Sequence, residues 1–350
     1  MVKVVIAGCG AIARKRHAPA CIAYGKERIE IGFFDPVRQS AQSLAEQYGG
    51  MVYDRLEDVL QDREVKAVLV CTPEKYHCDT VIACLNAGKH VLCEKPAART
   101  YEEALEMQRV QHETQKESRR TLAIAFSQRH YEEYRTAKRL IKEGTIGKVL
   151  MFRTCLANSG VEHFVCGNGE DFYDRCLDNV GGVMSNVGCH RVDLISWLLD
   201  QQIEQVLAYT PTLDKHFSNG ERIPKEDTAM VILKLQDGIS GMLWTSWCNY
   251  GGADADTQIF GTLGSLRISS QNRIILEKSD GTGTEIVVEK AESQRLGYDV
   301  VWDFLDHLTQ DKEVCADVCA GVRCMEVMDA IERSNLTGTW ASAGQSRPGL

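Results

Sequence analysis

Short apolar runs alternate with longer polar segments through the first third of the chain. The segments between the runs are rich in Ala, Glu and Gln, and the runs themselves span residues 2–7, 29–34, 67–71 and 90–93. Strands separated by helical segments of this length pair in parallel, with each helix crossing over the sheet. The run Ala67-Val68-Leu69-Val70-Cys71 is apolar throughout, which is typical of a strand covered on both faces. Residues 1–125 are therefore predicted to form a doubly wound α/β domain.

The pattern of apolar and polar residues changes after residue 126. A helical pattern at 132–144 and a strand at 148–154 precede an irregular, glycine-bearing stretch at 158–182, and a further helix is predicted near 190–199. Alternating strands follow at 203–209, 228–236, 239–247, 257–260, 265–269, 273–278 and 284–289, and two helices at 296–310 and 319–334 end the pattern. Asp237-Gly238 and Asp280-Gly281 are hairpin signals. Residues 126–350 are therefore predicted to form an α+β domain with a large, mostly antiparallel open sheet.

Charge and hydropathy narrow the classes of partner. The formal net charge of −9 argues against nucleic acid and against an anionic membrane surface. No apolar run approaches the roughly 18 residues that a membrane span needs. We therefore expect a cytoplasmic protein with a small-molecule ligand.

The 14 cysteines change this picture little. Most lie inside apolar strand or helix patterns, and no Cys-x-x-Cys pair occurs in the sequence. Structural zinc sites use such close pairs, so no metal site is expected. Buried, reduced thiols are the interpretation that fits a cytoplasmic chain.

A glycine-rich turn follows the first strand. In Gly8-x-Gly10-x-x-Ala13, the first glycine permits a tight turn, the second lets backbone approach a pyrophosphate, and the small third residue lets helix and strand pack closely. The helix that begins there presents free N–H groups to phosphates, which adds Ala11 and Ile12 to the candidate cofactor contacts. A tight turn without ligand is the alternative.

A carboxylate stands where a dinucleotide ribose is expected. Asp35 lies 22 residues after Ala13, at the end of the second strand, where it can accept hydrogen bonds from ribose hydroxyls. It would repel a 2′-phosphate, so NAD is favoured over NADP, although Arg38 lies close enough to weaken that preference.

Two further strand ends carry polar residues. Ligands of an open parallel sheet bind outside the carboxyl ends of its strands. Thr72-Pro73 with His77 and Glu94-Lys95 are therefore expected at the cofactor edge, although His77 fits a structural helix-start histidine equally well. Lys95 could exchange a proton with a substrate hydroxyl if its pKa were lowered by burial or by a neighbouring cation. His190, at the start of an apolar helix, has an intrinsic pKa suited to proton transfer.

Together these motifs resemble the glucose–fructose oxidoreductase, inositol dehydrogenase and rhizopine-catabolism family (Gfo/Idh/MocA). The resemblance covers most of the chain, and its most specific part is the segment from Gly88 to Pro96. It also includes Gly8-x-Gly10-x-x-Ala13, Asp35, Thr72-Pro73 with His77, Gly181-Gly182 through His190 and Asp193, and Phe260 to Leu266.

The resemblance implies a Rossmann domain and a C-terminal domain whose open sheet forms a homodimer or homotetramer interface. It implies NAD-dependent oxidation of a secondary hydroxyl on a sugar, a sugar derivative or a cyclitol. Lys95 and His190 match the positions that assist proton transfer, and Glu94 and His77 match positions near the cofactor ribose. Arg129, Asn158 and Arg175 are candidate substrate contacts, and His163 and Tyr173 are candidate lining residues.

One position departs from the family pattern. Asn186 stands four residues before His190, where the family typically has an aspartate. An amide can hydrogen-bond a hydroxyl but cannot accept a proton. Either Lys95 and His190 carry the proton chemistry with Asn186 orienting substrate, or a nearby carboxylate substitutes, or turnover is lost. The carboxylates available in the irregular stretch are Glu170, Asp171, Asp174 and Asp178.

Two other functions remain open at this point. Relatives of this kind can oxidise a sugar transiently and cleave a glycoside, which regenerates NAD without net redox change. The chain could also sense a dinucleotide or metabolite without turnover, an interpretation that Asn186 favours and that the presence of both Lys95 and His190 opposes.

Overall fold

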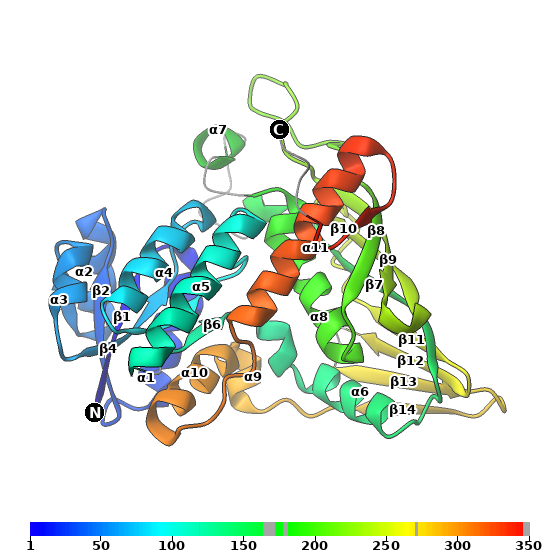
Figure 1. Cartoon of the computed structure of the whole chain (residues 1–350), viewed down its shortest axis with the longest axis horizontal. Helices are drawn as coiled ribbons and strands as arrows, with labels where there is room; N and C mark the ends of the chain where they lie inside the picture. The colour runs from blue at the N-terminus through cyan, green and yellow to red at the C-terminus, as the bar shows by residue number, and fades with distance from the viewer. Residues whose placement is uncertain (119, 164–171, 178–180, 270–271, 346–350) are drawn as a thin grey trace. The chain divides into compact units, whose positions relative to one another are not determined.

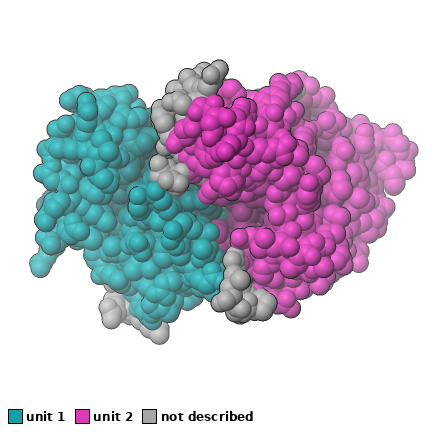
Figure 2. Space-filling view, turned by 90° about the horizontal axis from the view of Figure 1, so that it is seen from above, with its two compact units in different colours: residues 1–127, 291–322 teal, residues 128–290, 323–350 magenta. Residues whose placement is uncertain are grey.

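The computed structural model describes residues 1–118, 120–163, 172–177, 181–269 and 272–345. The chain forms two compact units (Figure 2). Unit 1 comprises Met1–Ser127 and Ala291–Val322, and unit 2 comprises Gln128–Lys290 and Arg323–Leu350.

Unit 1 is built on a six-stranded parallel sheet in the order β3-β2-β1-β4-β5-β6. The strands are β1 (Val2–Ala7), β2 (Ile29–Phe34), β3 (Met51–Tyr53), β4 (Val65–Val70), β5 (His90–Cys93) and β6 (Leu122–Ile124). The four predicted strands are confirmed, and β3 and β6 have only three residues each, too few to give a sequence pattern. The strand order reverses at β1 and β4, and such a reversal is where parallel sheets bind ligands.

Helices cross between these strands (Figure 1). They are η1 (Ala13–His17), α1 (Ala18–Tyr24), α2 (Arg38–Tyr48), α3 (Leu56–Gln61), η2 (Glu74–Tyr76), α4 (His77–Asn86) and α5 (Tyr101–Ser118). η1 is a π-helical turn directly after the glycine motif, a local widening that sequence periodicity does not reveal.

Residues 291–322 belong to unit 1, whereas the sequence pattern predicts that residues 126–350 form the second domain. This segment contains α9 (Glu292–Leu296) and α10 (Asp299–Gln310). The apolar side of α10, including Phe304 and Leu305, joins the same buried core as Tyr24 of α1. The Tyr24 hydroxyl also donates a 2.7 Å hydrogen bond to Asp306. Long-range complementarity between α1 and α10 explains the difference, because neither helix alone specifies the other as its partner.

Unit 2 contains a nine-stranded sheet in the order β14-β13-β12-β11-β7-β10-β9-β8-β15. The strands are β7 (Val149–Ala157), β8 (Ile203–Tyr209), β9 (Thr228–Leu235), β10 (Ser240–Ser246), β11 (Thr257–Gly261), β12 (Gly264–Ser269), β13 (Arg273–Lys278), β14 (Gly283–Val287) and β15 (Ala341–Ser342). β7 and β10 pair in parallel, and the neighbouring pairs on both sides are antiparallel. The predicted mostly antiparallel sheet and both Asp-Gly hairpins are confirmed.

One face of this sheet is covered by α6 (Glu132–Lys142) and α8 (Cys189–Leu199), which contact each other and the sheet (Figure 1). The remaining helical segments are η3 (Ser127–His130), η4 (Val161–His163), α7 (Phe172–Cys176), η6 (Met184–Gly188), η7 (Gln236–Gly238) and α11 (Val318–Thr337). On the other face, Met230, Ile232 and Met242 are 49%, 43% and 58% exposed, so an apolar surface is left open. No helix within the described residues is long and apolar enough to cross a membrane.

The cysteines follow the interpretation drawn from the sequence. Within the described residues, twelve are free thiols, and Cys71, Cys84, Cys93 and Cys189 are all buried. Burial raises the pKa of Cys84 to about 12. Buried thiols of this kind behave as small apolar side chains.

The attachment of α10 to unit 1 can be tested with a matched pair of leucines. Leu305 is fully buried in the core of unit 1, and Leu296 is 50% exposed. We expect Leu305→Ala to lower the free energy of unfolding by about 2–5 kcal/mol because it leaves a cavity. Leu296→Ala should change it by less than about 1 kcal/mol. Equal effects of the two substitutions in urea unfolding would contradict this packing.

Candidate active site

The glycine turn after β1 is fixed by backbone contacts on one side and open on the other. Gly8 has φ +93°, and a Cβ there would lie 2.7 Å from the backbone of Cys71 and Thr72. At Gly10, a Cβ would meet no atom within 4 Å. Gly8 is therefore required by the fold, whereas Gly10 leaves space beside its backbone. That is the arrangement expected where a pyrophosphate approaches the turn.

The turn is tied to the carboxylate at the end of β2. Asp35 Oδ2 accepts a 2.7 Å hydrogen bond from the Cys9 N–H, and Oδ1 accepts one of 2.8 Å from the Val37 N–H. Asp35 thus lies beside the glycine turn, as a ribose-binding carboxylate must. Arg38 forms an exposed ion pair with Asp54, which directs its charge to another carboxylate.

The loop after β4 offers one unsatisfied group. The Thr72 hydroxyl oxygen is buried without a hydrogen-bond partner, next to the backbone that Gly8 touches. A buried hydroxyl of this kind usually has a partner, so its position is consistent with a bound ligand group. Pro73, directly after it, precedes η2. Gly10, Asp35 and Thr72 together fit a dinucleotide at this edge of the sheet.

His77 links two of the loops that follow strands of unit 1. Its ring is 1% exposed, with Nδ1 2.8 Å from the Pro96 carbonyl oxygen and Nε2 2.9 Å from the Thr72 carbonyl oxygen. Both ring nitrogens are therefore engaged by main-chain groups. The ring joins the loop after β4 to the loop after β5, as the structural alternative predicts, and a contact between His77 and the cofactor ribose stays a prediction.

Glu94 and Lys95 end β5 beside a histidine that the sequence analysis missed. His17, the last residue of η1, is fully buried and its Nε2 lies 2.7 Å from Glu94 Oε1. Glu94 Oε2 accepts a 3.1 Å hydrogen bond from the Lys95 N–H. Burial raises the pKa of Glu94, but the hydrogen bond with His17 and the charges of His17, Lys95 and Arg16 outweigh it and bring the pKa to about 2. Glu94 is thus a buried anion that positions the Lys95 backbone.

The only sequence signal for His17 was its place one helical turn after Ala13. Nothing in the pattern of residues 13–17 indicates that this helix widens into a π-turn and aims the imidazole at β5. The pairing with Glu94 joins positions 77 residues apart, so it could not be found locally.

In unit 2, Asn186 and His190 lie on consecutive helical segments. Asn186 belongs to η6, and His190 is the second residue of α8. Glu226 holds the start of η6, because its Oε1 accepts a 3.1 Å hydrogen bond from the Met184 N–H. A Cβ on Gly182 would lie 2.1 Å from the Glu226 carboxylate, so this approach needs the glycine. Asn186 and His190 are both partly exposed.

Arg129 is paired with a buried carboxylate. Its guanidinium is 9% exposed and donates two hydrogen bonds to Asp193, of 2.9 Å and 2.6 Å. Burial raises the pKa of Asp193, and Arg129 opposes that rise. The bidentate pair gives the buried Arg129 guanidinium a structural role, and a contact between Arg129 and substrate stays a prediction. Asp193 is therefore part of a buried ion pair within unit 2.

The irregular stretch is described only in part. The side-chain oxygen of Asn158 accepts a 2.9 Å hydrogen bond from the Gly160 N–H, which shapes its own turn. Asp174 is exposed and accepts hydrogen bonds from the backbone and hydroxyl of Ser218. Glu170, Asp171, Asp178 and the side chain of Arg175 lie outside the described residues. Among the residues that are described, no group of three or more His, Cys, Asp or Glu side chains is arranged to hold a metal ion.

Comparison with known proteins gives independent evidence for the family of this chain. A model described as "Oxidoreductase family, NAD-binding Rossmann fold" matches residues 2–121, and the GFO/IDH/MocA C-terminal domain matches residues 134–267. The chain is 28% identical to inositol 2-dehydrogenase 2 of Saccharopolyspora erythraea over 264 residues, which is 75% of this chain and 72% of that protein.

Solved structures share the fold over nearly the whole chain. A levoglucosan dehydrogenase in complex with NADH and levoglucosan has a TM-score of 0.84 at 19% identity, covering 99% of this chain and 100% of that one. The WlbA dehydrogenase from Bordetella pertussis, in complex with NADH and UDP-GlcNAcA, has a TM-score of 0.82 at 22% identity, covering 99% and 98%. At these identities the likeness shows the fold alone.

Two glycine substitutions separate folding from cofactor binding. Gly10→Ala should leave thermal unfolding near that of the wild type, because its Cβ enters open space. It should weaken NADH binding by about tenfold or more. Gly8→Ala should destabilise the protein by about 1–3 kcal/mol because of its strained φ and backbone clash. NADH titration by fluorescence and thermal unfolding measure the two effects, and undiminished binding by Gly10→Ala would remove the pyrophosphate from this turn.

Proposed function

The chain belongs to the GFO/IDH/MocA family of NAD-binding oxidoreductases, and on that basis we propose that it oxidises a secondary hydroxyl of a sugar, a sugar derivative or a cyclitol. The observation that carries the proposal is the edge of unit 1, where Gly10, Asp35 and Thr72 leave room for a dinucleotide and Lys95 follows the buried Glu94. The similarity to inositol 2-dehydrogenase 2 of Saccharopolyspora erythraea supports a polyhydroxylated substrate.

The reaction divides into a hydride and a proton. The glycine turn and Asp35 would hold NAD, which would supply the acceptor for the hydride of the substrate carbon. The hydroxyl proton passes to this chain's own groups, for which we propose Lys95 and His190. In the reverse direction, the same groups return the proton to the carbonyl oxygen. We assign Asn186 to orienting a substrate hydroxyl, because an amide donates and accepts hydrogen bonds but takes no proton.

The coenzyme preference follows from charge. The Asp35 carboxylate lies against the glycine turn and repels a 2′-phosphate, and Arg38 is paired with Asp54. This favours NAD over NADP. The relatives named above are dehydrogenases, so glycoside cleavage and ligand sensing are not favoured. Buried, protonated thiols fit a reducing compartment, and we propose a cytoplasmic location.

We further propose that the open face of the nine-stranded sheet binds a second copy of the chain. Met230 and Ile232 on β9 face outward, and the register pairs Ile232 with Met242 of β10 and Met230 with Trp244. These side chains form a continuous apolar surface across neighbouring strands. Surfaces of this kind are usually covered in an assembly. We therefore propose that the chain forms a homodimer or a homotetramer through this surface.

Turnover is tested by following NADH absorbance with NAD and a panel of sugars, sugar phosphates and cyclitols. We expect NADH formation with at least one neutral polyol. Lys95→Ala should lower kcat by about 100-fold or more, the range for loss of a general acid–base group. The matched control is Lys66→Ala, because Lys66 is exposed near the start of β4, at the far end from Thr72. Turnover of Lys95→Ala within a few-fold of the wild type would refute its proton-transfer role.

Assembly is tested with one outward residue. Ile232→Lys places a charge in the middle of the apolar surface and should shift the protein toward monomer in light scattering. Leu336→Lys, at a 75% exposed position on α11, is the matched control and should leave the mass unchanged. A wild-type monomer, or an unchanged assembly of Ile232→Lys, would overturn the proposed interface.

A further inference from the structure

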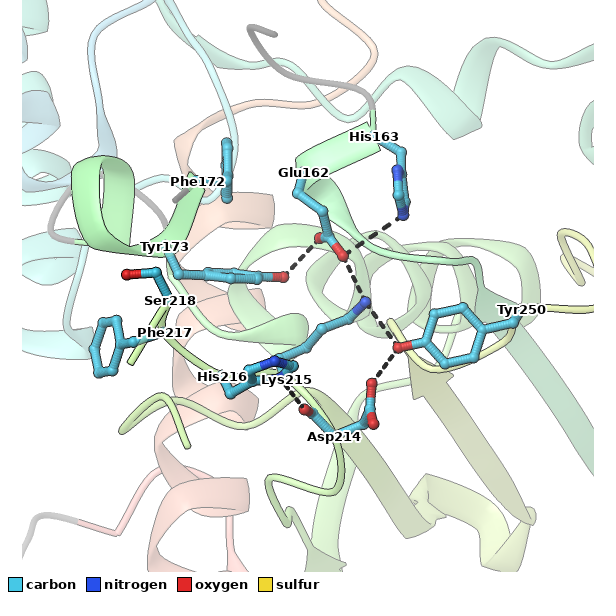
Figure 3. Close-up of a pocket in the computed structure, with 10 residues that line it drawn as sticks. All are labelled: Glu162, His163, Phe172, Tyr173, Asp214, Lys215, His216, Phe217, Ser218 and Tyr250. Atoms are coloured by element: carbon cyan, nitrogen blue, oxygen red, sulfur yellow. Dashed lines mark hydrogen bonds and ion pairs between the residues drawn. The ribbon is translucent and has the colours of Figure 1, made fainter. Parts of the chain in front are cut away.

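Each unit contains a largely buried, hydrogen-bonded pair of ionisable side chains. In unit 2, Lys215 Nζ lies 2.5 Å from Glu162 Oε1, and both residues line a cavity of about 510 Å³ (Figure 3). In unit 1, His17 Nε2 lies 2.7 Å from Glu94 Oε1. The two pairs differ in what they hold in place.

The pair in unit 2 belongs to a network of side chains around the cavity. Lys215 Nζ also donates to the Ser159 carbonyl oxygen at 2.8 Å and to the Tyr250 hydroxyl at 3.1 Å. The Tyr173 hydroxyl donates a 2.7 Å hydrogen bond to Glu162 Oε2. An ammonium group has three donors, so all three donors of Lys215 are used inside this network.

The pair in unit 1 reaches the main chain of the residue that is proposed to exchange the proton. His17 is fully buried, and Glu94 is 8% exposed. The second carboxylate oxygen of Glu94, Oε2, accepts a 3.1 Å hydrogen bond from the Lys95 N–H. The imidazole, the carboxylate and the Lys95 amide therefore form one continuous chain of contacts.

The charge on Glu94 allows both contacts at once. Burial raises the pKa of Glu94, but the hydrogen bond with His17 and the nearby positive charges outweigh it and bring the pKa to about 2. An ionised carboxylate has two acceptor oxygens and carries no proton, so it can accept from the imidazole and from the amide together. This arrangement requires a proton on Nε2 of His17.

The polar contact of His17 is directed at Glu94 alone. Within the described residues, Nδ1 of the ring is buried and has no hydrogen-bond partner. Burying an imidazole costs the free energy of its lost hydration. The single contact that offsets this cost is the one with the Glu94 carboxylate.

A local widening of the helix aims His17 at β5. The Ala18 N–H donates to the carbonyl oxygen of Ala13, five residues back, so residues 13–17 form a π-helical turn. Single π-turns of this kind recur at functional sites. The neighbouring Arg16 lies against Gly297, where a Cβ would be 3.2 Å from the guanidinium Nε. The end of the π-turn is thus held on a second side.

The carbonyl side of Lys95 is held by a different histidine. His77 Nδ1 lies 2.8 Å from the carbonyl oxygen of Pro96, the next residue. The main chain is therefore fixed before and after the Lys95 side chain. Proton transfer needs heavy atoms within about 2.6–3.2 Å of each other, and a misplacement of about 1 Å can cost about 100-fold in rate.

We propose that His17 is a positioning residue for Lys95. It holds Glu94 in the orientation in which Oε2 binds the Lys95 N–H, and so fixes the point from which the Lys95 side chain extends. The kinetic consequence rests on the proposed function, whereas the positioning itself needs neither NAD nor turnover. His17 touches neither substrate nor cofactor in this role.

Two amides of different length separate positioning from packing. In His17→Gln, the side-chain nitrogen can take the place of imidazole Nε2 and donate to Glu94. His17→Asn carries the same amide on a side chain one methylene shorter, which does not reach. Both variants bury one amide, so the cost of burying a polar group is similar. His112→Gln, at an exposed position on α5, is the control, and thermal unfolding checks the fold of all three.

The first readout is hydrogen exchange of the Lys95 amide, measured by NMR without NAD or substrate. The reference is the Val91 amide in β5, which donates a 2.8 Å hydrogen bond to the Thr121 carbonyl oxygen. Relative to Val91, His17→Asn should speed exchange at Lys95 by about tenfold or more, because local opening becomes easier. His17→Gln and His112→Gln should stay within about threefold of the wild type.

The second readout is NADH formation. His17→Asn should lower kcat by about tenfold or more, with KM for the polyol and Kd for NADH within about threefold, because only the proton-transfer geometry changes. His17→Gln should restore kcat. A purely structural role would instead lower stability and activity in both variants alike.

A third readout uses the wild-type protein and decides the point even where His17→Asn does not fold. NMR correlation of imidazole nitrogens and protons should show a proton on Nε2 of His17. An unprotonated Nε2 would remove the donor and overturn the proposal. Unchanged Lys95 exchange in a folded His17→Asn, or equal losses in both His17 variants, would also overturn it.

The outcomes keep this proposal apart from the proposed reaction. A loss confined to NADH affinity would place His17 in the cofactor site and refute the positioning of Lys95. If the wild type forms no NADH with any polyol while His17→Asn still loosens the Lys95 amide, the reaction fails and the positioning stands. Turnover that is indifferent to His17→Asn does the reverse.

Discussion

Carboxylates hold the loops at the strand ends in both units, and Glu94 and Asp227 among them are buried. Glu94 lies between His17 and the Lys95 backbone, and Asp35 ties the glycine turn to the end of β2. In unit 2, Asp227 does the same for the turn at 213–215. An unpaired buried carboxylate is costly by several kcal/mol, so the loops held by Glu94 and Asp227 can move only if these anions regain a partner. The rest of the ligand-binding geometry depends on this constraint.

The constraint also explains why the reactive groups are held through their backbones. His77 bonds two main-chain carbonyl groups, and Glu94 bonds the N–H of Lys95. In unit 2, Glu226 fixes the start of the helical segment that carries Asn186. Neighbouring residues thus fix the main chain at Lys95 and at the start of the segment that carries Asn186.

The sequence predicted most strands and the edge where ligands bind, because apolar periodicity and glycine turns are local signals. The short strands β3 and β6 were not predicted, because three residues are too few to show a periodic pattern of apolar positions. The return of α10 to the core around Tyr24 and the pairing of His17 with Glu94 join distant positions, so no local pattern indicates them. Arg129 was assigned to substrate because an arginine near a site motif gives no sign of a buried partner such as Asp193.

The reactivity of the buried thiols can report the unfolding of each unit. Cys21 and Cys93 lie in the core of unit 1, and Cys189 and Cys324 lie inside unit 2. Burial keeps the pKa of Cys21 near 12, so its reactive thiolate is scarce at neutral pH even before access is considered. Alkylating reagents will therefore modify these positions mainly after the surrounding unit has unfolded. Mass spectrometry of the labelled cysteines would then record, unit by unit, which part of the chain gives way first.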